Sequence, residues 1–210
     1  MGEKIERWGS RGRLPSPRRS RAELRRTEIF RGLGSVLRAR GVAGTTMGQI
    51  AQRLGMTKGS LYYYFKDKDA LLYQCHLRCI EVSLRALRKS RASRLPPDVR
   101  LREVLTSHIR GITEEIYGSV IITDLESISR ARRRKIVAAR DRFEGGVRDL
   151  IREGVTQGAF RKVDPKIAGF ALLGAINWIG KWYRPEGPLS SVEVAEQFAD
   201  FLVDGLRAEA

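Results

Sequence analysis

Cysteine and histidine are scarce in this sequence, with two of each among 210 residues. Cys75 and Cys79 lie four residues apart on one predicted helix, where the geometry for a disulfide is poor. No metal-ligand spacing links them to His76 or His108. We expect two reduced, packed thiols, with a redox pair or half of a metal site as the alternatives. The sequence therefore predicts no disulfide framework, no metal site and no cofactor.

Long apolar runs are also missing. The longest, around residues 168–180, is too short and too interrupted by glycine to span a bilayer. The first twenty residues are polar and rich in arginine, and they lack the apolar core of a secretory signal. These absences predict a cytoplasmic protein without a membrane partner.

Acidic residues are in the minority, with 24 Asp and Glu against 40 Lys and Arg and a net charge of +16. Such an excess favours a polyanionic partner, either nucleic acid or an anionic surface, although charge that only keeps the protein soluble is the alternative. The sequence contains no GxxxxGK[ST] loop, no GxSxG elbow and no HExxH motif. We therefore expect a binding protein and not an enzyme.

Hydrophobic periodicity predicts helices throughout most of the chain, with no alternating strand pattern and no internal repeat, so the predicted fold class is all-α. We expect a basic arm at residues 1–19, a small helical domain at 20–72 and a larger helical domain at 73–210. Pro15 and Pro17 disfavour a helix in the arm. Its arginines either enter a DNA minor groove or belong to an extension without function.

Residues 45–72 carry the most specific pattern, TTMGQIAQRLGMTKGSLYYYFKDKDALL. Thr46 and Gln49 form a capping box at the start of one short helix, and Thr57 caps a second. Gly55 supplies the backbone freedom for a sharp turn between them. Two short helices joined by a tight turn predict a helix-turn-helix, whose second helix enters the major groove of DNA. The residues expected to be buried are Ile50, Ala51, Leu54, Leu61 and Phe65.

The second of these helices carries a basic and hydroxyl-rich face. Lys58 is placed to reach a guanine edge, and Thr46 offers a hydroxyl and a helix N-terminus to a phosphate. Three consecutive tyrosines cannot all face one core, because each helical residue turns by about 100°. At least one is therefore exposed, which suits a DNA surface; an aromatic core stripe is the alternative, and Lys68 is a phosphate contact or a solvated lysine. The predicted DNA-binding residues are Thr46, Thr57, Lys58, Gly59, Ser60, Tyr62, Tyr63, Tyr64 and Lys68.

The TT start, the GMTKGSLYYYF segment and the following KDKDAL together resemble the N-terminal DNA-binding domain of the TetR family of bacterial transcriptional regulators. The resemblance implies that the residues named above contact double-stranded operator DNA. It also implies a homodimer, in which the last two long helices of each subunit form a four-helix bundle. Gly32, Leu33 and Leu37 depart from the small and aromatic residues common in the family, which concerns the packing of the first helix.

The remainder of the chain is predicted to form helices beyond the break at Pro96-Pro97. The helix that ends near Tyr183 is apolar on most sides and is expected to be buried. The apolar stripe from Ala195 to Leu206 is either intrachain core or a dimer surface. The predicted segments are 101–117, 120–128, 131–157, 164–183 and 190–206.

Two segments, NWIGKWYRPEGPLS and RRRKIVAARDRF, are similar to TetR regulators of fatty-acid and sterol catabolism that respond to acyl-CoA thioesters. Trp178 and Trp182 lie one turn apart and could stack on an acyl chain or adenine, while Lys181 and Arg184 could meet phosphates. The alternatives are tryptophan packing at a dimer interface and solvated charges. The predicted effector-binding residues are Asn177, Trp178, Lys181, Trp182 and Arg184.

These patterns together predict a ligand-responsive transcriptional repressor. We expect a dimer that binds a palindromic operator and is released by a small hydrophobic effector, with an acyl-CoA thioester as the candidate. A drug-responsive regulator of efflux is one alternative, although the second domain has few aromatic residues. A non-specific DNA-compacting protein is the other, and it would show no preference for a palindrome.

Overall fold

The computed structural model describes residues 21–115 and 125–208 of the chain. These residues form α-helices and one π-helical turn, and no strand is found among them, so the predicted all-α fold is confirmed. The basic arm, the last two residues of the predicted segment 101–117, and the part of the predicted segment 120–128 before residue 125 lie outside the described residues. The elements are α1 (Arg21–Arg40), α2 (Met47–Arg53), α3 (Lys58–Tyr64), α4 (Lys68–Arg91), α5 (Pro97–Arg110), η1 (Gly111–Glu115), α7 (Arg130–Thr156), α8 (Pro165–Trp182) and α9 (Ser191–Asp204).

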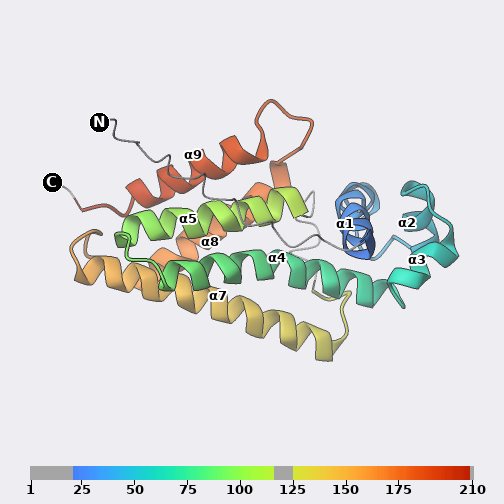
Figure 1. The fold of residues 1–210 in the computed structure, drawn as a ribbon, viewed down its shortest axis with the longest axis horizontal. Coiled ribbons are helices and arrows are strands. Elements are labelled where there is room, and N and C mark those ends of the chain that lie inside the picture. Colours follow the sequence, from blue (N-terminus) through green and yellow to red (C-terminus); the bar gives the residue numbers. More distant parts are fainter. Residues whose placement is uncertain (1–20, 116–124, 209–210) are drawn as a thin grey trace, which may run out of the picture.

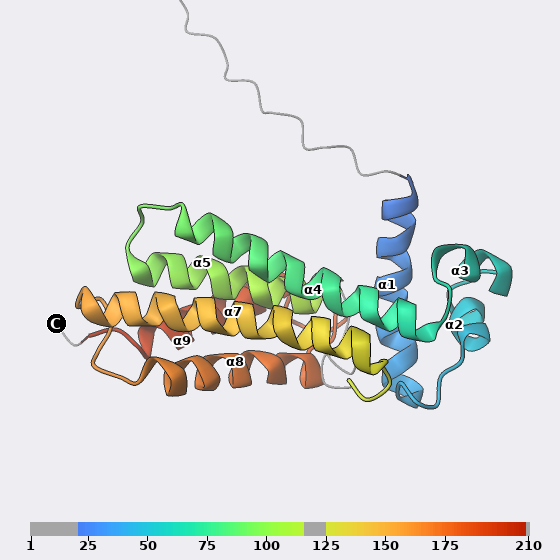
Figure 2. The same cartoon turned by 90° about the horizontal axis from the view of Figure 1, so that it is seen from below.

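The helices form an elongated bundle with a small three-helix head at one end (Figure 1). Helices α4, α5, α7, α8 and α9 lie alongside one another, whereas α1 crosses their direction (Figure 2). Helix α4 starts beside the head and runs far along the bundle, and α7 starts near the same end and runs beside α4 in the same direction (Figure 1). Both helices therefore connect the head with the body of the molecule.

The buried apolar side chains form two clusters. One joins α1, α2 and α3 to the start of α4, and it also includes Ile128 and Ile136 from the region of α7. The other joins the rest of α4 to α5, α7, α8 and α9. The first cluster extends past residue 72 to Cys79, so the boundary expected there remains a prediction. Cys75 and Cys79 are buried and form no disulfide with each other, as the packed-thiol interpretation requires.

Local signals place most helix ends where the sequence predicts them. Asp164 caps α8, with Pro165 at its first helical position, and Ser190 forms a capping box with Glu193 at the start of α9. Gly158, just past the end of α7, has a φ of +74°, a conformation that favours glycine.

Gly32 is explained by a close helix contact. A Cβ atom at this position would lie 2.0 Å from Cδ2 of Leu54. A larger residue here would have to displace the end of the Leu54 side chain, which packs directly against the backbone of α1. A glycine inside a helix costs about 1 kcal/mol relative to alanine, and this close contact accounts for its presence.

The expectation that α8 is buried on most sides is wrong for the single chain. Its inner face packs in the second cluster, but Ile167 is 65% exposed and Trp178 is 64% exposed. The apolar stripe on α9, in contrast, is buried within the chain. Ala195, Ala199 and Val203 are intrachain core, and α9 instead exposes Phe201, which is 78% accessible. No helix of the described residues is both long and apolar enough to cross a bilayer.

Candidate nucleic-acid interface and effector cavity

Side-chain caps fix the starts of α2 and α3, the two short helices of the head. The amide of Gln49 donates to Oγ1 of Thr46 at 3.3 Å, and Oε1 of Gln49 accepts from the amide of Thr46 at 2.9 Å. At the start of α3, the amide of Ser60 donates to Oγ1 of Thr57 at 3.0 Å. Gly55 has a φ of +61° in the turn between them. The predicted capping box, turn glycine and N-cap are therefore confirmed, and Thr57 has a structural task beside any contact with DNA.

Helix α3 has a buried face and an exposed face. Leu61 and the adjoining Phe65 are buried in the core of the head. Tyr62 and Tyr63 are 43% and 81% exposed, whereas Tyr64 turns inward and packs on that core. The three tyrosines thus divide as the helical rotation requires.

Lys58 and Ser60 lie on the exposed part of α3 with Tyr62. The ammonium of Lys58 is 5.9 Å from the centre of the Tyr62 ring, an arrangement in which cation and aromatic ring attract each other. These groups offer one positive charge, two hydroxyls and an apolar edge on one surface. Such a set can donate to phosphates and reach base edges.

Gly59 has no packing reason to be glycine. A Cβ atom added there would meet nothing within 4 Å, and its φ is not positive. The free protein therefore leaves open space at the start of α3. This space allows a large partner to approach closely. The contact of Gly59 with DNA remains a prediction.

The Lys68 side chain links two segments of the head by hydrogen bonds. Its ammonium donates to the carbonyls of Val42 and Thr45, each at 2.9 Å. An ammonium has three N–H donors, so one remains for a phosphate. Lys68 therefore ties the start of α4 to the segment before α2, a role that the sequence did not reveal.

The start of α7 is attached to the start of α4 by a polar junction, which we call the α4–α7 junction. The Arg132 guanidinium lies 2.8 Å from Asp69 and 3.3 Å from Asp67, and the amide of Ser129 donates to Asp69 at 3.1 Å. Asp67 also caps α4 by accepting from the amide of Ala70. Burial acts to raise the pKa of Asp69, but the bonds from Ser129 and Arg132 lower it overall.

A cavity of about 500 Å³ lies among α4, α5, α7 and α8. Its inner end is formed by buried residues such as His76, Ile112 and Phe143, and its outer end by the exposed positions Gly174 and Asn177 of α8. This volume is in the range of small-molecule sites. The lining residues are His76, Cys79, Ile80, His108, Ile112, Arg140, Asp141, Phe143, Glu144, Phe170, Leu173, Gly174 and Asn177.

Polar groups interrupt the apolar lining of this cavity. Arg140 of α7 lies 3.2 Å from Nδ1 of His76 on α4. Nδ1 of His108 on α5 lies 2.6 Å from the hydroxyl of Ser83. Burial, with a contribution from Arg140, lowers the pKa of His108 to about 4, so its ring is neutral at pH 7.

Sequence reasoning missed the role of His76, His108 and Arg140. A signal was present, because His108 follows Val104 by four residues and Arg140 follows Ile136 by four. Each polar residue therefore falls in the apolar stripe of its helix. A charged or titratable group in such a stripe indicates a buried polar contact or a ligand site.

Of the five predicted effector residues, only Asn177 lines the cavity. Trp178 and Trp182 lie on the exposed side of α8, as do Lys181 and the following Arg184. The Trp182 ring packs near Phe198 of α9, with 5.9 Å between ring centres. The structure therefore does not bring these four together around the cavity, and their contact with an effector remains a prediction.

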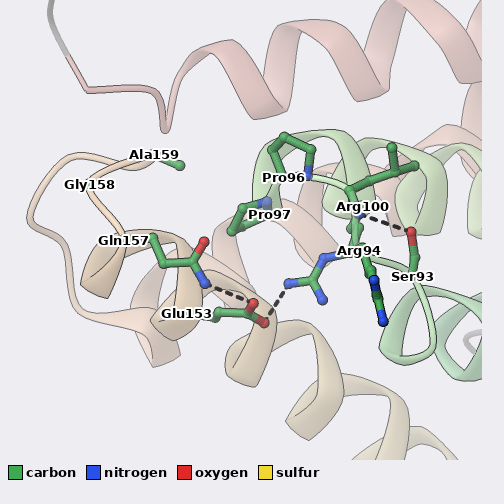
Figure 3. Close-up of a pocket in the computed structure, with 10 residues that line it drawn as sticks. Ser93, Arg94, Pro96, Pro97, Arg100, Glu153, Gln157, Gly158 and Ala159 are labelled. Carbon is green, nitrogen blue, oxygen red and sulfur yellow. Dashed lines mark hydrogen bonds and ion pairs between the residues drawn. The ribbon is translucent and has the colours of Figure 1, made fainter.

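A second cavity, of about 540 Å³, lies at the α4–α5 corner (Figure 3). This corner is at the end of the bundle opposite to the head (Figure 1). The cavity wall includes an ion pair of 2.5 Å between Arg100 and Glu153, and Glu153 also accepts from Gln157. The charges of Arg100 and Glu153 balance each other, and this pair links α5 to the end of α7. Its distance from the head makes this cavity the weaker candidate for an effector site.

A helix-turn-helix head joined by two long helices to a cavity-bearing bundle defines a DNA-binding regulator. Comparison with known proteins agrees. The family model for "Bacterial regulatory proteins, tetR family" matches residues 35–75, and that for "Tetracyclin repressor-like, C-terminal domain" matches residues 94–206. The chain belongs to the TetR family of bacterial transcriptional regulators.

Several known proteins are similar to this chain along most of its length. The HTH-type transcriptional repressor KstR2 of Rhodococcus jostii (strain RHA1) is 26% identical over 186 residues, which are 87% of this chain and 91% of that protein. The structure of the regulator PfmR from Thermus thermophilus superposes with a TM-score of 0.73 at 32% identity, covering 86% of this chain and 99% of that one. AibR, solved in complex with isovaleryl coenzyme A and operator DNA, gives a TM-score of 0.68 at 27% identity, covering 87% and 98%.

Proposed function

We propose that this protein is a transcriptional repressor that binds a palindromic operator as a homodimer and is released by an acyl-CoA thioester. The carrying observation is the connection between two sites. The helices α4 and α7 both pack in the core of the head, which carries α3, and both line the cavity that contains His76 and Arg140. A ligand that fits only one arrangement of these helices shifts the population toward it and changes DNA affinity.

The DNA contact is supported by the exposed face of α3 and by the charge of the chain. Lys58, Ser60, Tyr62 and Tyr63 present donors on one side, and the net charge of +16 favours a polyanion. Thr46 at the start of α2 and the third donor of Lys68 are placed for phosphates. A protein that blocks polymerase at a promoter needs no further activity, so we assign no catalytic role.

The homodimer is supported by an unpartnered apolar surface on α8 and α9. Ile167, Phe170, Trp178 and Phe201 are all exposed in the single chain. A hollow of about 440 Å³ between the two helices is lined by Ile167, Ala171 and Phe201, among others. Pairing two such surfaces would form the four-helix bundle and hold two recognition helices about 34–36 Å apart, as successive major grooves require.

The acyl-CoA class is supported by AibR, which was solved with isovaleryl coenzyme A, and by the apolar lining of the cavity. A regulator of drug efflux is the rival. Cavities for cationic drugs combine aromatic rings with acidic groups. The lining here does include Asp141 and Glu144, but Asp141 is exposed and Glu144 is paired with Arg148. Arg140 in the same cavity opposes a cationic ligand and favours one that carries acceptor oxygens.

Fluorescence anisotropy on the DNA upstream of the protein's own gene tests this proposal. The complex would be titrated with a long-chain acyl-CoA, the matching free acid and coenzyme A alone. We expect specific binding and release by the thioester only. Specific binding that ignores all three would retain the regulator and discard the effector class, and equal affinity for random duplex would favour DNA compaction.

A further inference from the structure

The inner end of the cavity does not suit the methyl end of a saturated acyl chain. Besides Ile112 and Phe143, it contains the guanidinium of Arg140 and the imidazoles of His76 and His108. Burying a methyl group against such groups removes water from them without offering a hydrogen bond in return. A ligand that ends in an acceptor oxygen would offer one.

The protonation states of these groups can be assigned from their contacts. A guanidinium only donates hydrogen bonds, so Nδ1 of His76 accepts from Arg140 and the proton of the neutral ring lies on Nε2. His108 is neutral at pH 7, because its pKa is about 4. Arg140 therefore brings a positive charge to this end, and the N–H at Nε2 of His76 is a neutral donor beside it.

The described lining also contains two acidic side chains, Asp141 and Glu144. Asp141 is exposed on α7, and Glu144 is bonded by Arg148, with 3.1 Å between Nε and Oε1. Asp141 is therefore accessible to solvent, and the charge of Glu144 is balanced by Arg148. Partial burial of Arg140, which lowers its pKa without removing its charge, strengthens its attraction for an acceptor relative to water.

We infer that the effector is an acyl thioester with a second oxygen function at the end of its acyl part remote from sulfur, and that Arg140 and His76 bind this oxygen. The inference rests on the proposed function, because it assigns the chemistry of that effector. The acyl part would lie along Ile80, Ile112 and Phe143, with the thioester toward Asn177 and the coenzyme outside. The oxygen is a carboxylate or a ketone, since both accept from a guanidinium.

Three thioesters with the same eight-carbon chain test the inference: octanoyl-CoA, 7-oxo-octanoyl-CoA and octanedioyl-CoA. Their affinities for the free dimer would be measured by isothermal titration calorimetry, without DNA. We expect at least one oxygenated ester to bind about tenfold to a hundredfold tighter than octanoyl-CoA, the difference that a charge-assisted hydrogen bond gives. The tighter of the two identifies the oxygen as carboxylate or ketone.

Two variants attribute the preference to its residue. Arg140→Gln keeps an N–H donor for His76 but loses the charge, and it should reduce the ratio of the oxygenated-ester to octanoyl-CoA affinities to about twofold or less. Arg142→Gln changes an exposed arginine of α7 that does not line the cavity, and it should retain the full preference. Arg140→Lys should restore part of it, which also controls for misfolding of the glutamine variant.

Equal affinities for the three esters, no binding of any of them, or a preference that survives in Arg140→Gln would each overturn the inference. The proposed function fails in a different way. In that case the oxygenated ester binds the free protein with the expected preference but does not release operator DNA in the anisotropy assay.

Discussion

Some side chains of α3 pack in the core of the head, and others are exposed for contact with a partner. Leu61 and Tyr64 face the core of the head, whereas Tyr62 and Tyr63 do not. Thr57 and Ser60 hold the start of the helix through their hydrogen bonds. Replacement of an exposed residue should therefore change DNA binding without changing the fold.

Tyr62→Ala should lower affinity for the operator by about tenfold to a hundredfold, since loss of one good base or phosphate contact costs about 1–3 kcal/mol. Fluorescence anisotropy on operator and random duplex measures the effect, and size-exclusion chromatography with light scattering checks the oligomer. Leu95→Ala, which truncates an exposed side chain at the far end of the bundle, is the control. Unchanged operator affinity would remove Tyr62 from the interface.

His108 should make stability depend on pH. Its pKa is lowered from 6.5 to about 4 in the folded protein by burial, so the unfolded chain binds more protons between these values. The stability contributed by the neutral ring is present above pH 6.5 and is lost as the pH falls toward 4, by an amount on the order of 3 kcal/mol. Urea unfolding at pH 7 and pH 4.5 should show a smaller difference for His108→Gln than for the unchanged protein. An identical difference in both proteins would contradict the assignment.

At the scale of elements, α4 and α7 are the two helices that contribute to both ends of the molecule. Each lines the cavity, and the α4–α7 junction fastens them together beside the recognition helix. Arg140 lies two turns beyond Arg132 on α7. We therefore propose that a change in the spacing of the helices at the cavity would be passed to the start of α4.

Arg132→Gln should uncouple the two sites. The variant removes the ion pairs to Asp67 and Asp69 but leaves the cavity lining unchanged. We expect the ratio of operator affinities without and with a releasing effector to fall by about threefold to thirtyfold, the range typical of residues in coupling networks. Anisotropy titrations measure this ratio, and Arg134→Gln, an exposed position on the same helix, serves as the control. A ratio equal to that of the unchanged protein would exclude the junction from coupling.

At the scale of the whole molecule, the single chain leaves an apolar surface on α8 and α9 exposed to solvent. Helix α9 buries its Ala195–Val203 side against the chain itself and leaves Phe201 outside. A monomer with this surface would expose neighbouring aromatic side chains to water. The proposed dimer through these helices would remove that exposure and set the distance between the two heads.

Phe201→Glu should therefore weaken the dimer. A buried carboxylate without a partner costs several kcal/mol, so we expect mainly monomer at micromolar concentration and loss of most operator affinity. Analytical ultracentrifugation measures the oligomeric state. Leu95→Glu carries the same charge change at an exposed site away from α8 and α9 and should leave the dimer intact. A dimeric Phe201→Glu protein would place the interface elsewhere.

The sequence by itself determined the helices, their caps and the division of the head into buried and exposed faces. The caps at Thr46, Thr57 and Ser190 and the turn at Gly55 depend on residues within a few positions of one another, so the pattern in the chain contains the whole interaction. The alternation of Leu61 with the tyrosines follows in the same way from the rotation of a helix.

Only the tertiary structure decided what forms the cavity and which apolar surfaces stay exposed. His76 and Arg140 are 64 residues apart, and their contact exists because α4 packs on α7. The same packing selected which side of α9 is core, left the tryptophans of α8 outside the cavity, and gave Lys68 its carbonyl partners. Periodicity shows that a helix has an apolar face, but the neighbour that covers this face is fixed by contacts between distant parts of the chain.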